Sequence, residues 1–134
     1  MSKLKDVFLL DFLYPCATYV VNRLGIDMSP RDLYQTTGKE YDGNPESLSV
    51  GDVLVWNYRK DSPTLDVVMQ MTDRGPITSR KIQGKHLGVY EGDGLVSDLT
   101  FYEDPPIPFI RQILLEEIKS RPLEVIPYDT LKDR

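Results

Sequence analysis

The sequence predicts a single α+β domain in which helices come first and a run of antiparallel strands follows. Apolar residues recur at helical spacing near the start of the chain. Short apolar runs separated by Gly, Asn, Asp and Pro fill most of the remainder. Helices and strands that are segregated in this way are typical of the α+β class. The chain has 134 residues, enough for one domain with a hydrophobic core but not for two.

The helical part of the prediction centres on the only cysteine, Cys16. Apolar positions in residues 4–13 predict a short first helix. Pro15 predicts the first position of a second helix, because a proline there loses no intrahelical hydrogen bond and already has a helical φ. Apolar residues recur at helical spacing as far as Leu24, and Gly25 suits the left-handed position that follows a helix end.

A third helix and a loop are expected next. Ser29 is a suitable N-cap and Pro30 a suitable first helical residue, which predicts a short helix that runs to about Thr37 and ends at Gly38. Residues 39–50 are rich in Gly, Asn, Pro and Ser. This composition predicts an exposed loop.

The strands are predicted by apolar runs that are bounded by turn residues. Residues 53–58 follow a tight turn at 50–52 and are apolar on both faces at their start, which indicates a strand in the middle of its sheet. The remaining elements that we expect are strands 65–71 and 77–82 as one hairpin, strands 86–91 and 95–102 as another, an amphipathic helix at 109–119, a last strand at 123–127 and a polar tail at 128–134.

Charge and composition limit the partners. The formal net charge of −5 argues against nucleic acid and anionic membranes, since both require a positive surface. One cysteine cannot form an internal disulfide, and one cysteine with one histidine offers too few ligands for a zinc site, so no metal or cofactor is expected. The apolar run near the N-terminus is too short for a signal peptide or a membrane span. We therefore expect a protein made in the cytoplasm, and action elsewhere would require delivery.

The expected chemistry depends on Cys16 and His86. In the first turn of a helix, unpaired N–H groups and the positive end of the helix dipole favour the thiolate, which is the nucleophilic form of cysteine. A cysteine nucleophile needs a base close by, and His86 is the only histidine in the chain. The sequence therefore predicts a cysteine hydrolase with these two residues in the active site.

The hairpin that begins at His86 suggests a third catalytic group. A three-residue loop at 92–94 would pair Glu91 with Leu95 and place Asp98 one diagonal step from His86 on the same face. There the carboxylate would orient the imidazole. A two-residue loop would turn the neighbours of Asp98 to that face instead. Glycine at the end of the loop favours the first register.

Three stretches resemble the NlpC-type papain-like cysteine peptidases: residues 16–20, 48–56 and 86–94. In that family a cysteine at a helix N-terminus is followed by a strand after a Gly-Asp pair. A strand that begins with histidine and ends in a glycine-rich turn comes next. The family's third polar residue lies twelve positions after the histidine, which here is Asp98, in agreement with the register. The resemblance covers roughly residues 12–102 and implies the NlpC-type papain-like fold.

The resemblance also implies a function. It indicates a cysteine peptidase or amidase that cuts an amide bond through Cys16, His86 and Asp98, most often in peptide stems of bacterial peptidoglycan. Tyr14 would donate to the oxyanion, as a tyrosine often does in the family, and Trp56 would pack in the core or line the substrate groove. Such domains occur in secreted hydrolases, toxins and phage tail or lysis proteins. Phage tail or secretion-machine proteins are therefore the expected partners, and the virion or the cell envelope the expected place of action.

Several positions depart from the family pattern and leave alternatives open. The family has Asp before the cysteine and Ser-Gly after it, whereas this chain has Pro15, Ala17 and Thr18. Its third residue is more often His, Asn or Gln than Asp. The hairpin at 65–82 is an apparent insertion before His86. The alternatives are a catalytically inactive structural or binding module of the same fold, and an acyl hydrolase or transferase that acts on a lipid or an isopeptide.

Overall fold

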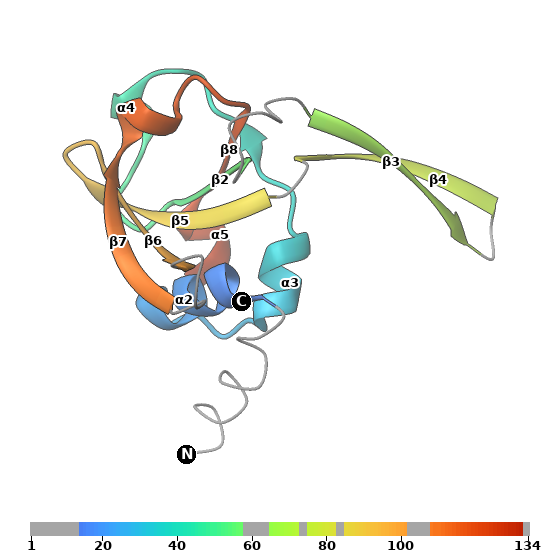
Figure 1. The fold of residues 1–134 in the computed structure, drawn as a ribbon, viewed down its shortest axis with the longest axis horizontal. Helices are drawn as coiled ribbons and strands as arrows, with labels where there is room; N and C mark the ends of the chain where they lie inside the picture. Colours follow the sequence, from blue (N-terminus) through green and yellow to red (C-terminus); the bar gives the residue numbers. More distant parts are fainter. Residues whose placement is uncertain (1–13, 58–64, 73–74, 83–84, 102–107, 133–134) are drawn as a thin grey trace, which may run out of the picture.

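The computed structural model describes residues 14–57, 65–72, 75–82, 85–101 and 108–132, with only the backbone described for 65–72, 75–82 and 101. The helix expected at 4–13 lies outside these residues. The described chain combines helices with antiparallel sheets and so belongs to the α+β class (Figure 1). Its helices are α2 (Pro15–Leu24), α3 (Pro30–Gln35), the 3-10 helix η1 (Pro45–Ser47), α4 (Leu115–Ile118) and α5 (Tyr128–Lys132).

Six of the described strands form the main sheet, in which neighbouring strands are antiparallel. Across the sheet their order is β1 (Lys39–Glu40), β8 (Leu123–Ile126), β2 (Val53–Asn57), β5 (Lys85–Gly92), β6 (Leu95–Phe101) and β7 (Pro108–Leu114). Two further strands, β3 (Leu65–Thr72) and β4 (Gly75–Ile82), form a separate hairpin that extends away from the sheet in Figure 1. Both predicted hairpins are therefore confirmed.

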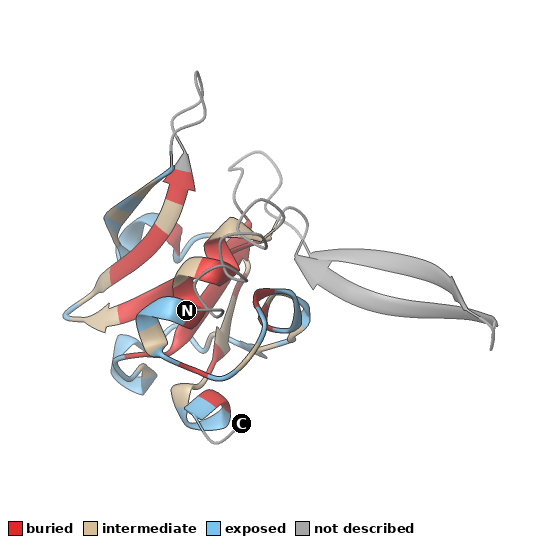
Figure 2. Ribbon diagram, turned by 90° about the horizontal axis from the view of Figure 1, so that it is seen from below, coloured by how far each residue is buried: buried red, intermediate tan, exposed pale blue. Residues whose placement is uncertain are grey.

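β2 lies in the middle of the sheet, as its apolar sequence predicted. It is buried along its whole length and pairs with β5 on one side and β8 on the other. Its alternating side chains divide the core into two clusters. Val53 and Val55 pack with residues of α2 and α3, whereas Leu54 and Trp56 pack with residues of α4. Figure 2 shows the buried residues gathered along α2 and the central strands β2 and β5.

The first described helices begin where the sequence predicted. α2 starts at Pro15 and is followed by Gly25 in the left-handed conformation, with φ of 63°. At the start of α3, the Ser29 side chain accepts a hydrogen bond from the backbone N–H of Asp32 at 3.1 Å. α2 packs against α3, β5 and β6. α2 is thus packed directly on the strand that carries His86.

The predicted end of α3 at Gly38 is wrong. The helix stops at Gln35, and Thr36 is already extended, with ψ of 132°. Gly38 has a different function: a Cβ atom there would lie 2.6 Å from the carbonyl oxygen of Val125 on β8. The glycine is needed because β1 and β8 approach closely at this point, and not because it terminates a helix.

The largest correction concerns the amphipathic helix predicted at 109–119. Residues 108–114 form the strand β7, and only α4 is helical. Exposure alternates along β7, with Phe109, Arg111 and Ile113 at the less exposed positions. Pairing with the outer edge of β6 supplies hydrogen bonds along the whole strand, and this tertiary contact overrides a local pattern that is also compatible with a helix.

Two further segments differ from the prediction. Residues 128–134 were expected to be a polar tail, but Tyr128–Lys132 form α5, whose Leu131 is 1% exposed and packs in the core cluster that contains residues of α2 and β2. The expected loop at 39–50 contains β1 and η1. The last strand, expected at 123–127, is confirmed as β8.

Candidate active site

Cys16 lies in the first turn of α2, where the sequence placed it. The Tyr14 side chain does not cap this helix. Instead, the Tyr14 carbonyl accepts hydrogen bonds from both the backbone N–H and the hydroxyl of Thr18, each at 2.9 Å. Cys16 is a free cysteine and is only 6% exposed. The helix start thus holds the thiol in a defined, nearly buried position.

His86 connects the thiol to a carboxylate. It lies near the start of β5 and is 5% exposed. Its Nε2 is 2.7 Å from Oδ2 of Asp98. The Cys16 thiol is close enough to the same imidazole to influence its pKa. Because Nε2 faces the carboxylate, Nδ1 is the nitrogen left for the thiol proton. The structure thus brings Cys16, His86 and Asp98 together in one buried chain of polar groups.

The pairing of β5 with β6 sets the distance between His86 and Asp98. Val89 lies opposite Ser97, which is the register that we predicted for this part of the hairpin. Continued along the two strands, this register places Asp98 diagonally across from His86 on the same face. The observed contact between the two side chains agrees with that placement.

The turn of this hairpin differs from the three-residue loop that we predicted. Gly92, and not Glu91, pairs with Leu95, so the connection consists of Asp93 and Gly94 alone. Both have positive φ, 53° and 76°, as a tight hairpin turn requires. The register shifts before Gly92, where one extra residue is accommodated. This bulge compensates for the shorter loop and leaves the pairing nearer to the histidine as predicted.

Arg111 is a neighbour of the site that the sequence did not reveal. It lies directly opposite Asp98 across β6 and β7. Its Nε donates to Oδ1 of Asp98 at 2.9 Å and its Nη2 donates to Oδ2 at 2.8 Å. The Asp98 side chain is fully buried, whereas that of Arg111 is 35% exposed. The sequence analysis missed the pairing of Arg111 with Asp98 because it predicted a helix for residues 109–119. The signal that favoured a strand there was the aromatic and β-branched residues around Arg111.

For both His86 and Asp98, burial and hydrogen bonding shift the pKa in opposite directions. Burial lowers the pKa of His86, but hydrogen bonds with Asp98 and Cys16 outweigh it, so the pKa is raised above 6.5. Burial raises the pKa of Asp98, but hydrogen bonds from His86 and Arg111 outweigh it, so the pKa is lowered below 3.8. The site therefore favours an imidazolium beside a carboxylate.

Trp56 supports His86 from the neighbouring strand. The two residues pair across β2 and β5, and their ring centroids lie 5.1 Å apart at an angle of 79°. Trp56 is 1% exposed and so offers no surface to a substrate. Gly88 leaves room for the indole, since a Cβ atom there would lie 2.9 Å from it. Of the two positions expected for Trp56, the core position is the one that the structure has.

Two tyrosines lie near the thiol. The rings of Tyr14 and Tyr34 are tilted by 49° with centroids 5.3 Å apart. The Tyr34 hydroxyl donates to the backbone oxygen of Lys85 at 3.2 Å, and Nζ of Lys85 lies 5.2 Å from the centre of the Tyr34 ring. Burial, then the electrostatic influence of Cys16 and Tyr14, raises the pKa of Tyr34. Nothing in the sequence of α3 singled out Tyr34 as a neighbour of the cysteine.

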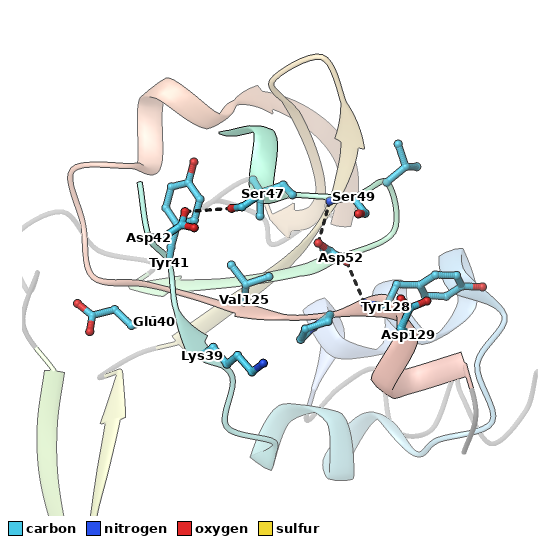
Figure 3. Close-up of a pocket in the computed structure, with 13 residues that line it drawn as sticks. Lys39, Glu40, Tyr41, Asp42, Ser47, Ser49, Asp52, Val125, Tyr128 and Asp129 are labelled. Atoms are coloured by element: carbon cyan, nitrogen blue, oxygen red, sulfur yellow. Dashed lines mark hydrogen bonds between the residues drawn. The ribbon is translucent and has the colours of Figure 1, made fainter. Parts of the chain in front are cut away.

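A separate hollow lies beside β1, β8 and the start of α5 (Figure 3). Asp52 braces it by accepting hydrogen bonds from the backbone N–H groups of Ser49 and Tyr128, both at 2.9 Å. None of the residues that line this hollow belongs to the group formed by Cys16 and its partners. It is therefore not part of the candidate active site.

In the part of the chain that the structure describes, no three His, Cys, Asp or Glu side chains are grouped so that they could hold a metal ion. None of the described helices combines the length and the apolar character that crossing a bilayer requires.

Comparison with known proteins adds no family assignment. No protein-family model matches the chain, and neither a curated protein nor a solved structure matches it significantly. Arguments about function therefore depend on the geometry around Cys16 and on the short stretches of sequence that surround it.

Proposed function

We propose that this protein is a cysteine hydrolase with an NlpC-type papain-like fold, and that it cleaves an amide bond through Cys16, His86 and Asp98. The observation that carries the proposal is a buried imidazole that is near the only thiol and whose Nε2 lies 2.7 Å from a buried carboxylate. A nucleophile, a base and a group that orients the base must meet in this way for acyl transfer. The order of the elements, from cysteine helix to histidine strand to acid strand, supports the same assignment.

In the first half of the reaction, the Cys16 sulfur attacks the carbonyl carbon of the amide and its proton passes to Nδ1 of His86. The carbonyl oxygen becomes negatively charged. The backbone N–H of Cys16, one of the first N–H groups of α2, is suited to stabilise this charge, and Tyr14 would add a hydroxyl. His86 then gives the proton to the amide nitrogen, the C–N bond breaks, and an amine leaves behind a thioester.

In the second half, water replaces the amine. His86 takes a proton from the water, the resulting hydroxide attacks the thioester carbon, and the C–S bond breaks. The proton returns to the sulfur, which restores the thiol and releases a carboxylic acid. Asp98 keeps the imidazole oriented through both halves and stabilises the imidazolium.

Peptide stems of peptidoglycan are the proposed substrate. This part of the proposal is supported by the resemblance of the residues around Cys16 and His86 to peptidases that most often act on such stems. Delivery by a phage tail or a secretion machine would bring the enzyme to the cell wall. Acyl transfer on a lipid or an isopeptide would use the same three residues.

A second candidate is a binding or structural module without catalysis. The observation that favours it is burial, because Cys16 and His86 are 6% and 5% exposed and leave a substrate little access. Reactivity of the thiol separates the two candidates, since a catalytic thiol must be both ionised and accessible.

The test is the pH dependence of Cys16 alkylation by iodoacetamide, in the wild type and in His86→Ala, with Cys16→Ala as the blank. The single cysteine makes the readout specific. For an enzyme, we expect rapid alkylation at neutral pH that slows markedly in His86→Ala. Stem peptides would then be assayed for release of new amines, which Cys16→Ala should abolish. Slow alkylation that His86→Ala leaves unchanged would exclude the enzyme and leave the structural module.

A further inference from the structure

We propose that Arg111 is a positioning residue of this site: its guanidinium fixes the plane of the Asp98 carboxylate and shares its charge, so that Asp98 orients His86 without trapping its proton. This inference rests on the proposed function. It assigns to the edge strand β7 a part in the chemistry that none of the resembling stretches contains, since those stretches end before residue 108.

The first argument is geometric. Arg111 approaches Asp98 with two donors, Nε to Oδ1 at 2.9 Å and Nη2 to Oδ2 at 2.8 Å. Two parallel hydrogen bonds to one carboxylate fix its plane, which a single bond would leave free to rotate. Oδ2 is also the atom that faces Nε2 of His86 at 2.7 Å. The guanidinium therefore fixes the oxygen on which the imidazole depends.

The second argument concerns charge. Among the described residues, the titrating groups that act on His86 include the Cys16 thiol from α2 and the Asp98 carboxylate from β6, and the uncharged Trp56 ring packs against the imidazole from β2. Asp98 is fully buried, and alone it would hold an imidazolium strongly. Arg111 supplies a second positive charge to the same carboxylate. The attraction that remains for His86 is weaker, so the imidazole can release its proton to the leaving amine.

The third argument is the position of Arg111 in the sheet. Asp98 and Arg111 are directly opposite residues on β6 and β7, so their side chains share a face. The Arg111 side chain is 35% exposed while its partner is fully buried. The arginine thus lies between solvent and the carboxylate, and it compensates a buried negative charge whose isolation would be costly.

The experiment compares two variants. Arg111→Met removes both the charge and the pair of parallel donors, whereas Arg111→Lys keeps the charge but loses the pair of parallel donors. The imidazole of the only histidine is titrated by NMR in each folded variant. We expect the pKa of His86 to rise in Arg111→Met and to stay near the wild-type value in Arg111→Lys. We expect kcat on a cleaved substrate to fall in both, by about tenfold to a hundredfold, as when groups that orient metal-binding histidines are removed.

Unchanged His86 titration and unchanged Cys16 alkylation in folded Arg111→Met would overturn the proposal, because a purely structural arginine would produce that result. If Arg111→Met does not fold, Arg111→Gln carries the same comparison with Arg111→Lys. The NMR titration requires no turnover. An upward shift in a protein that cleaves no substrate would therefore support the role of Arg111 while the proposed hydrolase fails, and the two outcomes stay distinguishable.

Discussion

Asp98 is the residue on which the candidate site depends most. Its side chain is fully buried and meets one cationic group on each of two neighbouring strands, His86 and Arg111. A buried carboxylate is stable only when such partners satisfy it, because burial of an unpaired charge is very costly. The same contacts that make Asp98 tolerable in the core also fix the imidazole beside the thiol.

Replacement of Asp98 by Asn keeps the shape of the side chain but removes its charge. It also replaces one hydrogen-bond acceptor, a carboxylate oxygen, by a donor, the amide NH2 group. We expect kcat to fall by roughly a thousandfold to ten-thousandfold, because the imidazole would be held in the wrong tautomer. The assay is release of amines from a cleaved peptide, with near- and far-UV circular dichroism as the control for folding. A variant that stays folded and retains most of its activity would contradict the role of Asp98.

The pH dependence of stability follows from the directions of the two pKa shifts. The pKa of folded His86 is raised above 6.5, so its contribution is complete below pH 6.5 and is lost as the pH rises through the folded value. The pKa of folded Asp98 is lowered below 3.8, so its contribution is present above pH 3.8 and is lost as the pH falls through the folded value. The pair therefore stabilises the fold most between these two limits.

This dependence can be measured by urea unfolding below pH 6.5 and well above it. We expect the free energy of unfolding of the wild type to decrease toward the higher pH, and this decrease to be smaller in His86→Gln, which cannot titrate. Equal decreases in the two proteins would show that the imidazolium of His86 does not stabilise the folded state.

At the scale of elements, the central strand β2 organises the core. Both of its faces are buried, and its alternating side chains enter two different clusters. β7, at the edge, is different: Ile110 and Leu114 are 63% and 50% exposed. Each strand has four apolar residues among the Val, Ile, Leu, Phe and Trp types, but those of β2 are buried and two of those of β7 are exposed, so burial determines what each strand contributes to stability.

Truncation of one leucine on each strand tests this difference. Leu54 is 0% exposed, and we expect Leu54→Ala to lower the free energy of unfolding by about 2–5 kcal/mol, since the change removes buried methyl groups and leaves a cavity. The matched control is Leu114→Ala, for which we expect a change within about 0.5 kcal/mol. Chemical denaturation measures both. Similar effects at the two positions would contradict the order of the strands.

Across the molecule as a whole, the β3–β4 hairpin is separate from the sheet that holds the site. It forms its own two-stranded sheet, and Asn57 and Lys85, which precede and follow residues 58–84, are paired with each other on β2 and β5. Two adjacent antiparallel strands can be joined by a short turn. We therefore expect the fold of the site not to require the residues between them.

We expect a variant in which residues 58–84 are replaced by a four-residue turn to fold cooperatively and to keep the wild-type pH profile of Cys16 alkylation. Thermal unfolding followed by circular dichroism and the alkylation assay are the measurements. Activity on a large substrate is expected to respond if the hairpin contributes to recognition, whereas the profile of the thiol should not. Loss of cooperative unfolding would show that the hairpin is part of the core fold.

Features that depend on neighbouring residues could be predicted from the sequence. Pro15 and Gly25 marked the limits of α2, and the cap at Ser29 marked the start of α3, because capping groups act within one turn. The pairing of Val89 with Ser97 followed from strand parity, although the turn that produces it was predicted incorrectly. Parity along two strands therefore located Asp98 beside the histidine.

Features that depend on distant partners emerged only in the folded chain. The sequence of residues 109–114 is compatible with a helix or a strand. These residues form a strand because they pair with the edge of β6 that β5 does not occupy. That choice brings Arg111 to Asp98. Likewise, Tyr34 reaches the site because its ring packs against Tyr14, and Leu131 enters the core because α5 packs against other elements. Local patterns carry no information about such contacts, because the stabilising partner lies elsewhere in the chain.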